Sequence, residues 1–106
     1  MDYRIDWSPE AVEDVAAIAE YIARDSEMYA SSVVSTILDA VRCLSSFPRI
    51  GRRVPEMEDE SIRELFVYSY RLIYRVLDDS ILIVAVIHGK RLLESIARRF
   101  SDQIPS

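Results

Sequence analysis

Several residue types that build special sites are scarce in this chain of 106 residues. It holds one cysteine (Cys43), one histidine, one lysine and two glycines. A single cysteine excludes an intramolecular disulfide and is typical of a cytoplasmic protein. We expect Cys43 to be a small buried hydrophobe, with a reactive thiol as the alternative. One histidine and one cysteine are too few for a structural zinc site, so we expect no metal and no cofactor.

Long apolar runs and positive charge are lacking too. No run reaches the roughly 18 residues of a membrane-spanning helix, so we expect no membrane partner. The net charge of −5 argues against broad nucleic-acid binding, which needs a basic surface. Residues 1–46 carry nine acids and three bases, whereas residues 47–106 carry nine acids and ten bases, nine of which are arginine. Arginine suits the recognition of a carboxylate or a phosphate.

The first part of the chain predicts a strand followed by a helix. Residues Tyr3–Trp7 alternate apolar and polar side chains, as a half-buried strand does. Ser8 is a good N-cap and Pro9 suits the first helical position. The helix should end near Arg24. Its predicted apolar stripe consists of Val12, Val15, Ala16, Ala19, Ile22 and Ala23.

A second helix should begin after Asp25 and Ser26 and end by Phe47 and Pro48, because proline cannot donate an interior helical hydrogen bond. So short a connection predicts an antiparallel helical hairpin. The predicted apolar stripe consists of Ala30, Val33, Val34, Ile37, Leu38, Val41 and Leu44. We expect both stripes to pack against the sheet that follows.

Residues 49–61 are polar and predict a loop, which Gly51 should help to turn. Three strands are predicted at Ile62–Tyr68, Tyr70–Leu77 and Ile81–His88, with the first strand of the chain joining this meander at one side. The third is apolar on both faces, so it should be the central, fully covered strand. A short C-terminal helix is predicted within Arg91–Phe100. The fold class is therefore α+β, in one domain over residues 1–106.

One face of the middle meander strand should carry Arg71, Ile73 and Arg75, because alternate residues share a face. Such a face is either open or partly covered around Ile73. Gly89 should release the chain so that Lys90 and the residue after it approach this face. An arginine cluster of this kind suits a bound acidic segment or a phosphate. The alternative is that these arginines only form ion pairs with Glu64, Asp78 and Asp79.

Four segments in a fixed order carry a family resemblance. They are Trp7–Ala11 followed by Ile18–Asp25, then Phe47–Glu56, Tyr70–Arg75 and Val86–Arg91. Together they resemble the RelE/ParE superfamily of toxins from bacterial type II toxin–antitoxin systems, over Tyr3 to about Arg99. No single segment is specific, but their combination is. The resemblance implies a helical hairpin packed on a mostly antiparallel sheet.

Two functions are implied by this resemblance. RelE-like members cut mRNA on the ribosome, and here Arg71, His88 and Arg91 would be their catalytic residues. The sequence departs from that pattern, because Leu92–Phe100 contains no tyrosine and Lys90 is the only lysine. We expect His88 instead to pack or to form a hydrogen bond at the end of the sheet. ParE-like members poison DNA gyrase, a protein target, and the acidic balance favours this branch.

The ParE-like reading implies a ParD-like antitoxin that covers the helical grooves and the arginine face, with DNA reached only through that antitoxin. A degenerate toxin that serves only as an antitoxin-bound co-repressor is the third reading. Residues expected to contact the target or the antitoxin are Arg52, Arg53, Arg71, Arg75, Lys90, Arg91, Leu92, Leu93, Ile96 and Phe100.

Overall fold

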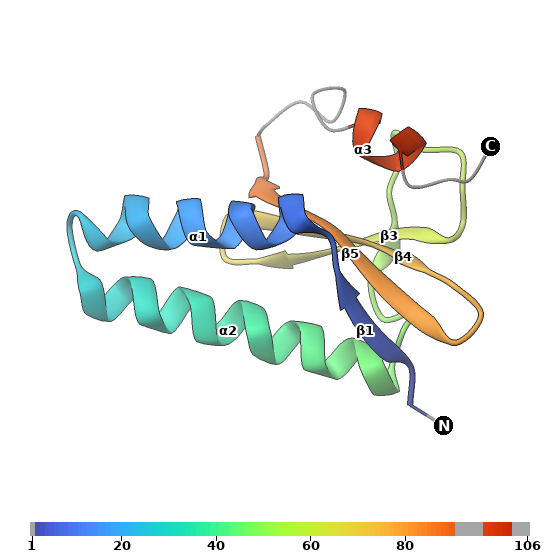
Figure 1. The fold of residues 1–106 in the computed structure, drawn as a ribbon, viewed down its shortest axis with the longest axis horizontal. Coiled ribbons are helices and arrows are strands. Elements are labelled where there is room, and N and C mark those ends of the chain that lie inside the picture. The colour runs from blue at the N-terminus through green and yellow to red at the C-terminus, as the bar shows by residue number, and fades with distance from the viewer. Residues whose placement is uncertain (1, 91–96, 103–106) are drawn as a thin grey trace.

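The computed structural model describes residues 2–90 and 97–102 (Figure 1). The residues of the C-terminal prediction that fall in 91–96 lie outside this range. The elements in chain order are β1 (Arg4–Trp7), α1 (Pro9–Ala23), α2 (Glu27–Ser46), β2 (Arg52–Arg53), β3 (Ile62–Val67), β4 (Tyr70–Val76), β5 (Ser80–His88) and α3 (Ala97–Asp102). Within the described residues, no helix is long and apolar enough to cross a membrane.

The strands form one sheet in the order β1-β5-β4-β3-β2. β1 joins β5 in parallel, and the other neighbours are antiparallel. The α+β prediction and the position of β1 are thus confirmed. Two details were wrong. The strand predicted to be central, β5, is interior, but β4 is the middle strand of the sheet. The segment predicted as a loop, residues 49–61, contains the short edge strand β2. Two arginines among turn residues gave no strand periodicity to detect.

Helix boundaries agree with the sequence prediction. Ser8 caps α1, with its Oγ accepting a hydrogen bond from the Ala11 N–H at 3.1 Å. Ser26 caps α2 in the same way, accepting from the Tyr29 N–H at 3.0 Å. Phe47 is the C-cap of α2, directly before the proline. The two helices run antiparallel beside the sheet, as Figure 1 shows.

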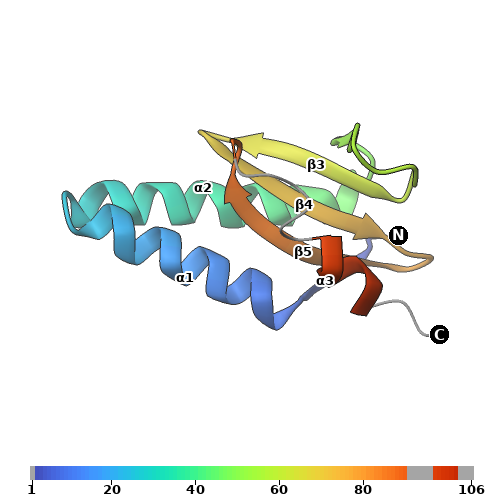
Figure 2. The same ribbon diagram turned by 90° about the horizontal axis from the view of Figure 1, so that it is seen from above.

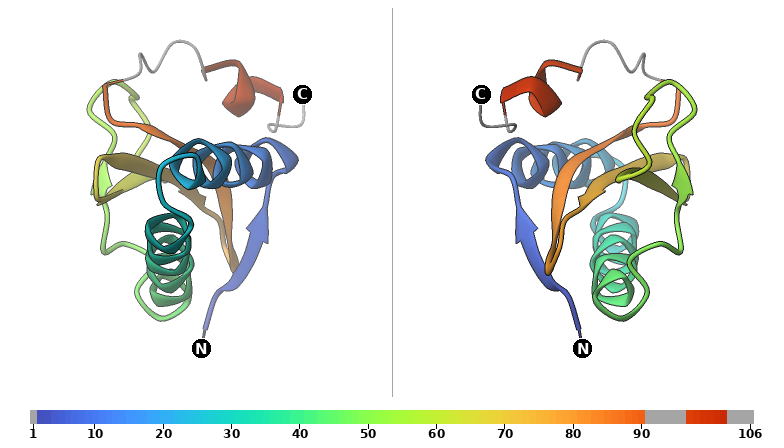
Figure 3. Two further views of the ribbon diagram at one scale, coloured as in Figure 1. Left: turned by 90° about the vertical axis from the view of Figure 1, so that its left-hand side faces the viewer. Right: turned by 90° about the vertical axis from the view of Figure 1, so that its right-hand side faces the viewer.

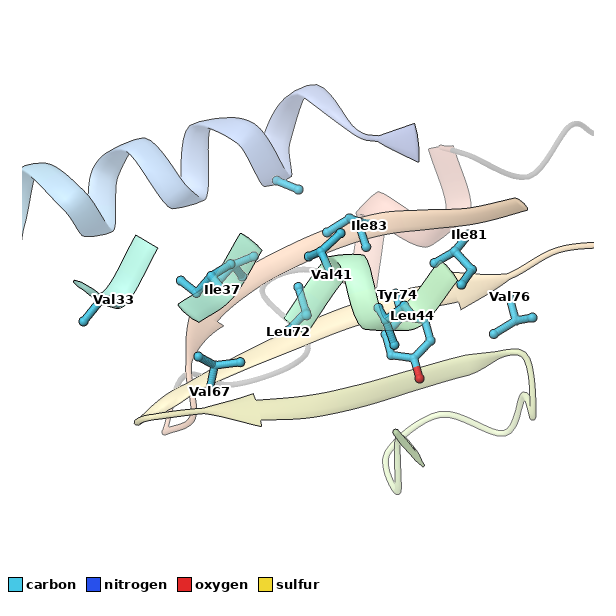
Figure 4. Packing of buried hydrophobic residues seen from close by; sticks show 12 residues of the cluster. Val33, Ile37, Val41, Leu44, Val67, Leu72, Tyr74, Val76, Ile81 and Ile83 are labelled. Atoms are coloured by element: carbon cyan, nitrogen blue, oxygen red, sulfur yellow. The ribbon is translucent and has the colours of Figure 1, made fainter. Parts of the chain in front are cut away.

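The main core lies between the hairpin and one face of the sheet. Four side chains of α2 belong to this core and are labelled in Figure 4; they are Val33, Ile37, Val41 and Leu44. Leu72, Tyr74 and Ile83 meet them from β4 and β5. Looking along the helices, Figure 3 shows the hairpin between β1 and β5 on one side and β3 on the other. Burial of this apolar surface is the chief stabilisation of the fold.

The apolar stripe predicted for α1 was partly wrong. The sheet side of this helix is formed by Ala11, Val15, Ile18 and Ile22. Val12 instead remains 53% exposed and faces the seam between the helices. The error has a simple cause: α1 is apolar over a wide arc, so its sequence does not show which part of that arc meets the sheet.

A second cluster covers the opposite face of the sheet. It includes Ile73 of β4, Val54 of the preceding loop and Phe100 of α3, all of which are buried. Ile73 therefore marks a covered patch, one of the two alternatives for this face. A β-bulge places Val84 and Ala85 in this same cluster, because Ile73 pairs with Ala85 and the next residue pairs with Ile83.

Among the described residues, no strand pairs with β5 beyond Ile83 on the β1 side, and side chains form hydrogen bonds with its backbone there. Asp14 of α1 accepts from the Val86 N–H at 3.0 Å. Arg99 of α3 donates to the Val84 carbonyl at 3.2 Å and to Asp14 at 2.7 Å. The hydrogen bond to Asp14 is the largest of several effects that raise the pKa of Arg99. The Asp14–Arg99 ion pair thus joins α1 to α3, and hydrogen bonds from its two residues join both helices to β5.

Cys43 was predicted to be buried, and this was wrong: it is exposed and unpaired. It lies on α2 between the buried positions Val41 and Leu44, where a helix turns its side chains outward. An apolar neighbourhood in sequence does not give the direction of a helical side chain.

Gly51 is required by space rather than by backbone conformation. Its φ is not positive, so, contrary to our expectation, the loop does not need glycine here for its backbone conformation. The reason for glycine is the close approach of neighbouring atoms. The Gly51 N–H donates to the Tyr74 hydroxyl at 3.0 Å. A Cβ at this position would lie 2.5 Å from the Glu64 carbonyl oxygen and 2.6 Å from the Tyr74 hydroxyl. Only glycine lets the loop approach the sheet this closely.

We predict that Gly51→Ala lowers the free energy of unfolding by about 1–3 kcal/mol, the usual cost of overpacking a dense interior. Urea denaturation followed by circular dichroism measures this. Gly89→Ala is the matched control, since a Cβ there would meet its nearest atom at 3.1 Å. An equal or smaller effect at Gly51 than at Gly89 would contradict the steric explanation.

Candidate functional site on the sheet face opposite the hairpin

A buried ion-pair network occupies the face of the sheet that carries the predicted arginines. Glu64 of β3 is fully buried at its side chain, and Arg71 of β4 is 7% exposed. The Arg71 Nε–H donates to Glu64 Oε1 at 2.8 Å. The other end of Arg71 forms two hydrogen bonds of 3.2 Å with the Glu56 carboxylate. The Arg52 Nε–H donates to Glu64 Oε2 at 2.5 Å.

Strand register explains this arrangement. Glu64 lies opposite both Arg52 of β2 and Ile73 of β4, and Arg71 lies two residues before Ile73 on the same face. The diagonal between Glu64 and Arg71 is within reach of long side chains. A buried carboxylate is costly unless it is paired and hydrogen-bonded. Arg71 supplies that pairing, and its guanidinium is in turn bound by the carboxylates of Glu64 and Glu56.

The loop before β3 completes the network. Hydrogen bonding from Arg71 is the largest effect on Glu56 and lowers its pKa below the ordinary value of 4.5, against a smaller opposing effect of burial. Because the folded-state pKa is the lower one, this stabilisation is present above pH 4.5 and is lost as the pH falls through the folded-state pKa. In acid, the Glu56–Arg71 pair should therefore hold the loop less strongly.

Aromatic rings accompany the remaining arginines of this face. Arg52 lies over the Phe66 ring, with the guanidinium carbon 5.7 Å from the ring centroid. Arg75 lies over Phe100 of α3 at 5.9 Å and faces Asp59 at 3.8 Å. Hydrogen bonds from Ser61 are the largest cause that lowers the pKa of Asp59. The arginine side chains thus contact rings and carboxylates together.

His88 lies on the other side of the sheet. It pairs with Tyr70 at the end of β5, next to the pairing of Ile87 with Arg71. The His88 and Tyr70 rings meet edge-on at 5.9 Å, and Tyr70 packs against the helix-side core. Arg71 shares the face of Ile73 in the opposite cluster. His88 Nδ1 also accepts from the Lys90 N–H at 3.2 Å, a sheet-end hydrogen bond of the kind expected.

The predicted site residues therefore divide into three groups. Arg52, Arg71, Arg75 and Phe100 come together on one face. Arg53 on the edge strand and Lys90 after β5 are exposed. Arg91, Leu92, Leu93 and Ile96 lie outside the described residues.

Sequence reasoning gave only part of this network. The alternative of pairing with Glu64 holds for Arg71, whereas Arg75 faces Asp59 rather than Asp78 or Asp79. The loop before β3 contributes Glu56, which also binds Arg71. The signal for Glu64 was a carboxylate that shares a strand face with the apolar residues Ile62 and Phe66.

A shallow apolar groove follows the seam of the helical hairpin. One part, of about 490 Å³, is lined by Trp7, Val12, Val15, Ala16, Ala19, Val34 and Leu38. It shares Ala19 and Val34 with a second hollow of about 520 Å³ that reaches Glu27 near the start of α2. We call these together the hairpin groove. Exposed apolar surface of this kind marks contact sites for other proteins.

No metal site is evident in the part of the chain that the structure describes. Across residues 2–90 and 97–102, no three His, Cys, Asp or Glu side chains are grouped so that they would hold a metal ion.

Comparison with known families identifies the chain. Residues 5–93 match the family model of the ParE toxin of the type II toxin–antitoxin system parDE. The chain belongs to this family. No curated protein sequence matches it significantly.

Solved structures share the fold. The chromosomal ParDE system of P. aeruginosa aligns with a TM-score of 0.69 and 22% identity, over 83% of this chain and 97% of that one. A mutant of the E. coli toxin RelE in the free state aligns with a TM-score of 0.68 and 18% identity, over 99% and 100% of the two chains. The RelBE2 toxin–antitoxin complex of M. tuberculosis aligns at 0.61 and 21%, over 83% and 99%.

We predict that Glu64→Gln lowers the free energy of unfolding by about 3–5 kcal/mol, because it leaves the buried Arg71 charge without its main partner. Thermal denaturation measures the loss. The double variant Glu64→Leu, Arg71→Met removes both charges and should recover most of it. Arg4→Ala breaks an exposed pair and should leave the melting temperature almost unchanged. A double variant no more stable than Glu64→Gln would contradict the proposed pairing.

Proposed function

We propose that this chain is a ParE-like toxin that binds and poisons DNA gyrase and is neutralised by a ParD-like antitoxin. The observation that carries the proposal is the state of Arg71. A nuclease of this superfamily would use Arg71 and His88 together, yet Arg71 is ion-paired with two glutamates and lies on the opposite face of the sheet from His88. An arginine held in this way offers no free fork to a phosphate.

The charge of the chain supports the same proposal. An RNA-cutting enzyme must approach a dense phosphate surface, and a net charge of −5 opposes that approach. A protein target needs only a shaped patch with a few aromatic or arginine anchors. Arg52 with Phe66 is such a pair: the Arg52 side chain is 62% exposed and Phe66 is 53% exposed. We propose that this pair contacts the target.

The hairpin groove is the proposed contact for the antitoxin. One half of its lining is apolar and the other half adds Glu27, Ser31 and Ser35, which suits a short amphipathic or extended segment that becomes ordered on binding. The related P. aeruginosa structure is of a ParDE system. The two halves of the groove together run along both helices, which gives a long track for such a segment.

We predict that Leu38→Asp disrupts capture by the antitoxin encoded beside this chain, because it places a charge in the apolar groove. Affinity should fall at least about tenfold, which isothermal titration calorimetry measures. Met28→Asp is the control: Met28 is 82% exposed and does not line the groove. Equal affinities of both variants would contradict groove binding.

We predict that induction of the chain without antitoxin causes filamentous cells and a DNA-damage response while protein synthesis continues at first. The purified protein should inhibit supercoiling by gyrase and should not cut mRNA in a translating extract. His88→Ala should keep its toxicity, whereas Arg52→Ala should lose part of it. In a nuclease, His88→Ala would instead cost on the order of 100-fold.

Rapid translation arrest with cleaved message, and with gyrase unaffected, would overturn the gyrase proposal. The family assignment would stand in that case, because it rests on the match of residues 5–93 and not on the target.

A further inference from the structure

Four tyrosines gather between the helical hairpin and the end of the sheet. Tyr21 comes from α1 and Tyr29 from α2, while Tyr68 lies in the turn between β3 and β4 and Tyr70 begins β4. Figure 2 shows this turn on the same side of the molecule as the connection between the helices. The proposed function uses none of these residues, and we call them the tyrosine cage.

The rings of the cage surround an open hollow of about 330 Å³. Its lining also includes His88 and Asp25. Tyr29 and Tyr68 meet edge-on with ring centroids 6.1 Å apart, and Tyr70 meets His88 in the same manner at 5.9 Å. Tyr21, Tyr29 and Tyr68 are 68%, 50% and 54% exposed, so a partner can reach their rings. Burial, and then the nearby Tyr29 and Tyr21, raise the pKa of Tyr70.

Tyr68 occupies a strained position. Val67 pairs with Tyr70, which leaves a connection of two residues, and Tyr68 has a φ of 54°. This region favours glycine, and a bulky side chain there costs free energy. The Gly89 N–H donates to the Ser69 carbonyl at 2.7 Å and holds the turn in place. The strained backbone projects a large aromatic ring toward Tyr29, where glycine would leave open space.

Charge determines what the cage can accept. Asp25 is the carboxylate that lines the hollow, whereas Asp14 in the adjoining hollow is already paired with Arg99. The cage helices belong to residues 1–46, which hold nine acids and three bases. Aromatic faces carry negative potential and attract cations. A carboxylate beside them adds to this attraction and opposes a phosphate or an acidic peptide.

We propose that the tyrosine cage binds the guanidinium of an arginine side chain presented by a partner polypeptide. Guanidinium stacks on aromatic faces more readily than the strongly hydrated lysine ammonium does, and its planar fork matches the Asp25 carboxylate. The cage shares no lining residue with the hairpin groove. The two surfaces can therefore be occupied separately or by one partner.

The test uses the full chain with its tyrosine rings labelled with carbon-13. It is titrated at low salt with an acetylated, amidated hexa-arginine peptide, and ring shifts are followed by nuclear magnetic resonance. The matched probe is the hexa-citrulline peptide, which has nearly the same shape but no charge. Saturable shifts of the cage tyrosines are expected with arginine, together with at least tenfold weaker binding of citrulline. Similar affinities for the two peptides would overturn the proposal.

Variants separate the aromatic contribution from general acidity. Tyr21→Leu should weaken hexa-arginine binding about fivefold or more, whereas Tyr21→Phe keeps the ring and should change it less than about twofold. Phe47→Leu is the control, because Phe47 is an exposed ring outside the cage. Asp25→Asn should also weaken binding. If Asp25→Asn weakens binding and Tyr21→Leu does not, the peptide is attracted only by acidic charge and the cage assignment is wrong.

Discussion

Burial of the two middle strands on both faces is the constraint from which the rest of the fold follows. β4 and β5 present apolar side chains in both directions, so each face of the sheet needs a cover. The helical hairpin covers most of one face. The other cover is thin, built from Val54 in a loop and Phe100 in α3. Charged residues enter the structure on this thin side, and there the buried Arg71 and Glu64 satisfy each other.

The order of elements was readable from the sequence because local chemistry and periodicity agreed. Ser8, Ser26 and the proline after Phe47 delimit the helices, and strand lengths follow apolar runs. The predictions that failed concerned the direction in which helical side chains point. The outward turn of Cys43 and the exposed position of Val12 depend on how α1 and α2 sit against the sheet. That orientation is a property of the packing, which no single helix encodes.

The sequence predicted which arginines belong to the candidate site, but it did not predict which carboxylates they pair with. The arginines and their shared face follow from alternation in β4. Their partners depend on the diagonal between strands and on the loop that brings Glu56 across, and neither is local in sequence. The tyrosine cage is similar: its members lie on two helices and a turn, so only the folded chain shows that Tyr29 and Tyr68 meet.

The parallel pairing of β1 with β5 has a consequence for the order in which the molecule forms. Arg4 pairs with Ser80, so the first strand of the chain has to wait for the last one. Contacts between residues so distant in sequence form slowly, because loop-closure entropy must be overcome before they stabilise anything. The meander of β3, β4 and β5, by contrast, joins neighbours through short turns. During synthesis the apolar hairpin emerges before its sheet exists, and a chain cut short before β5 has no partner for β1. Completion of the sheet is thus tied to synthesis of the chain through β5.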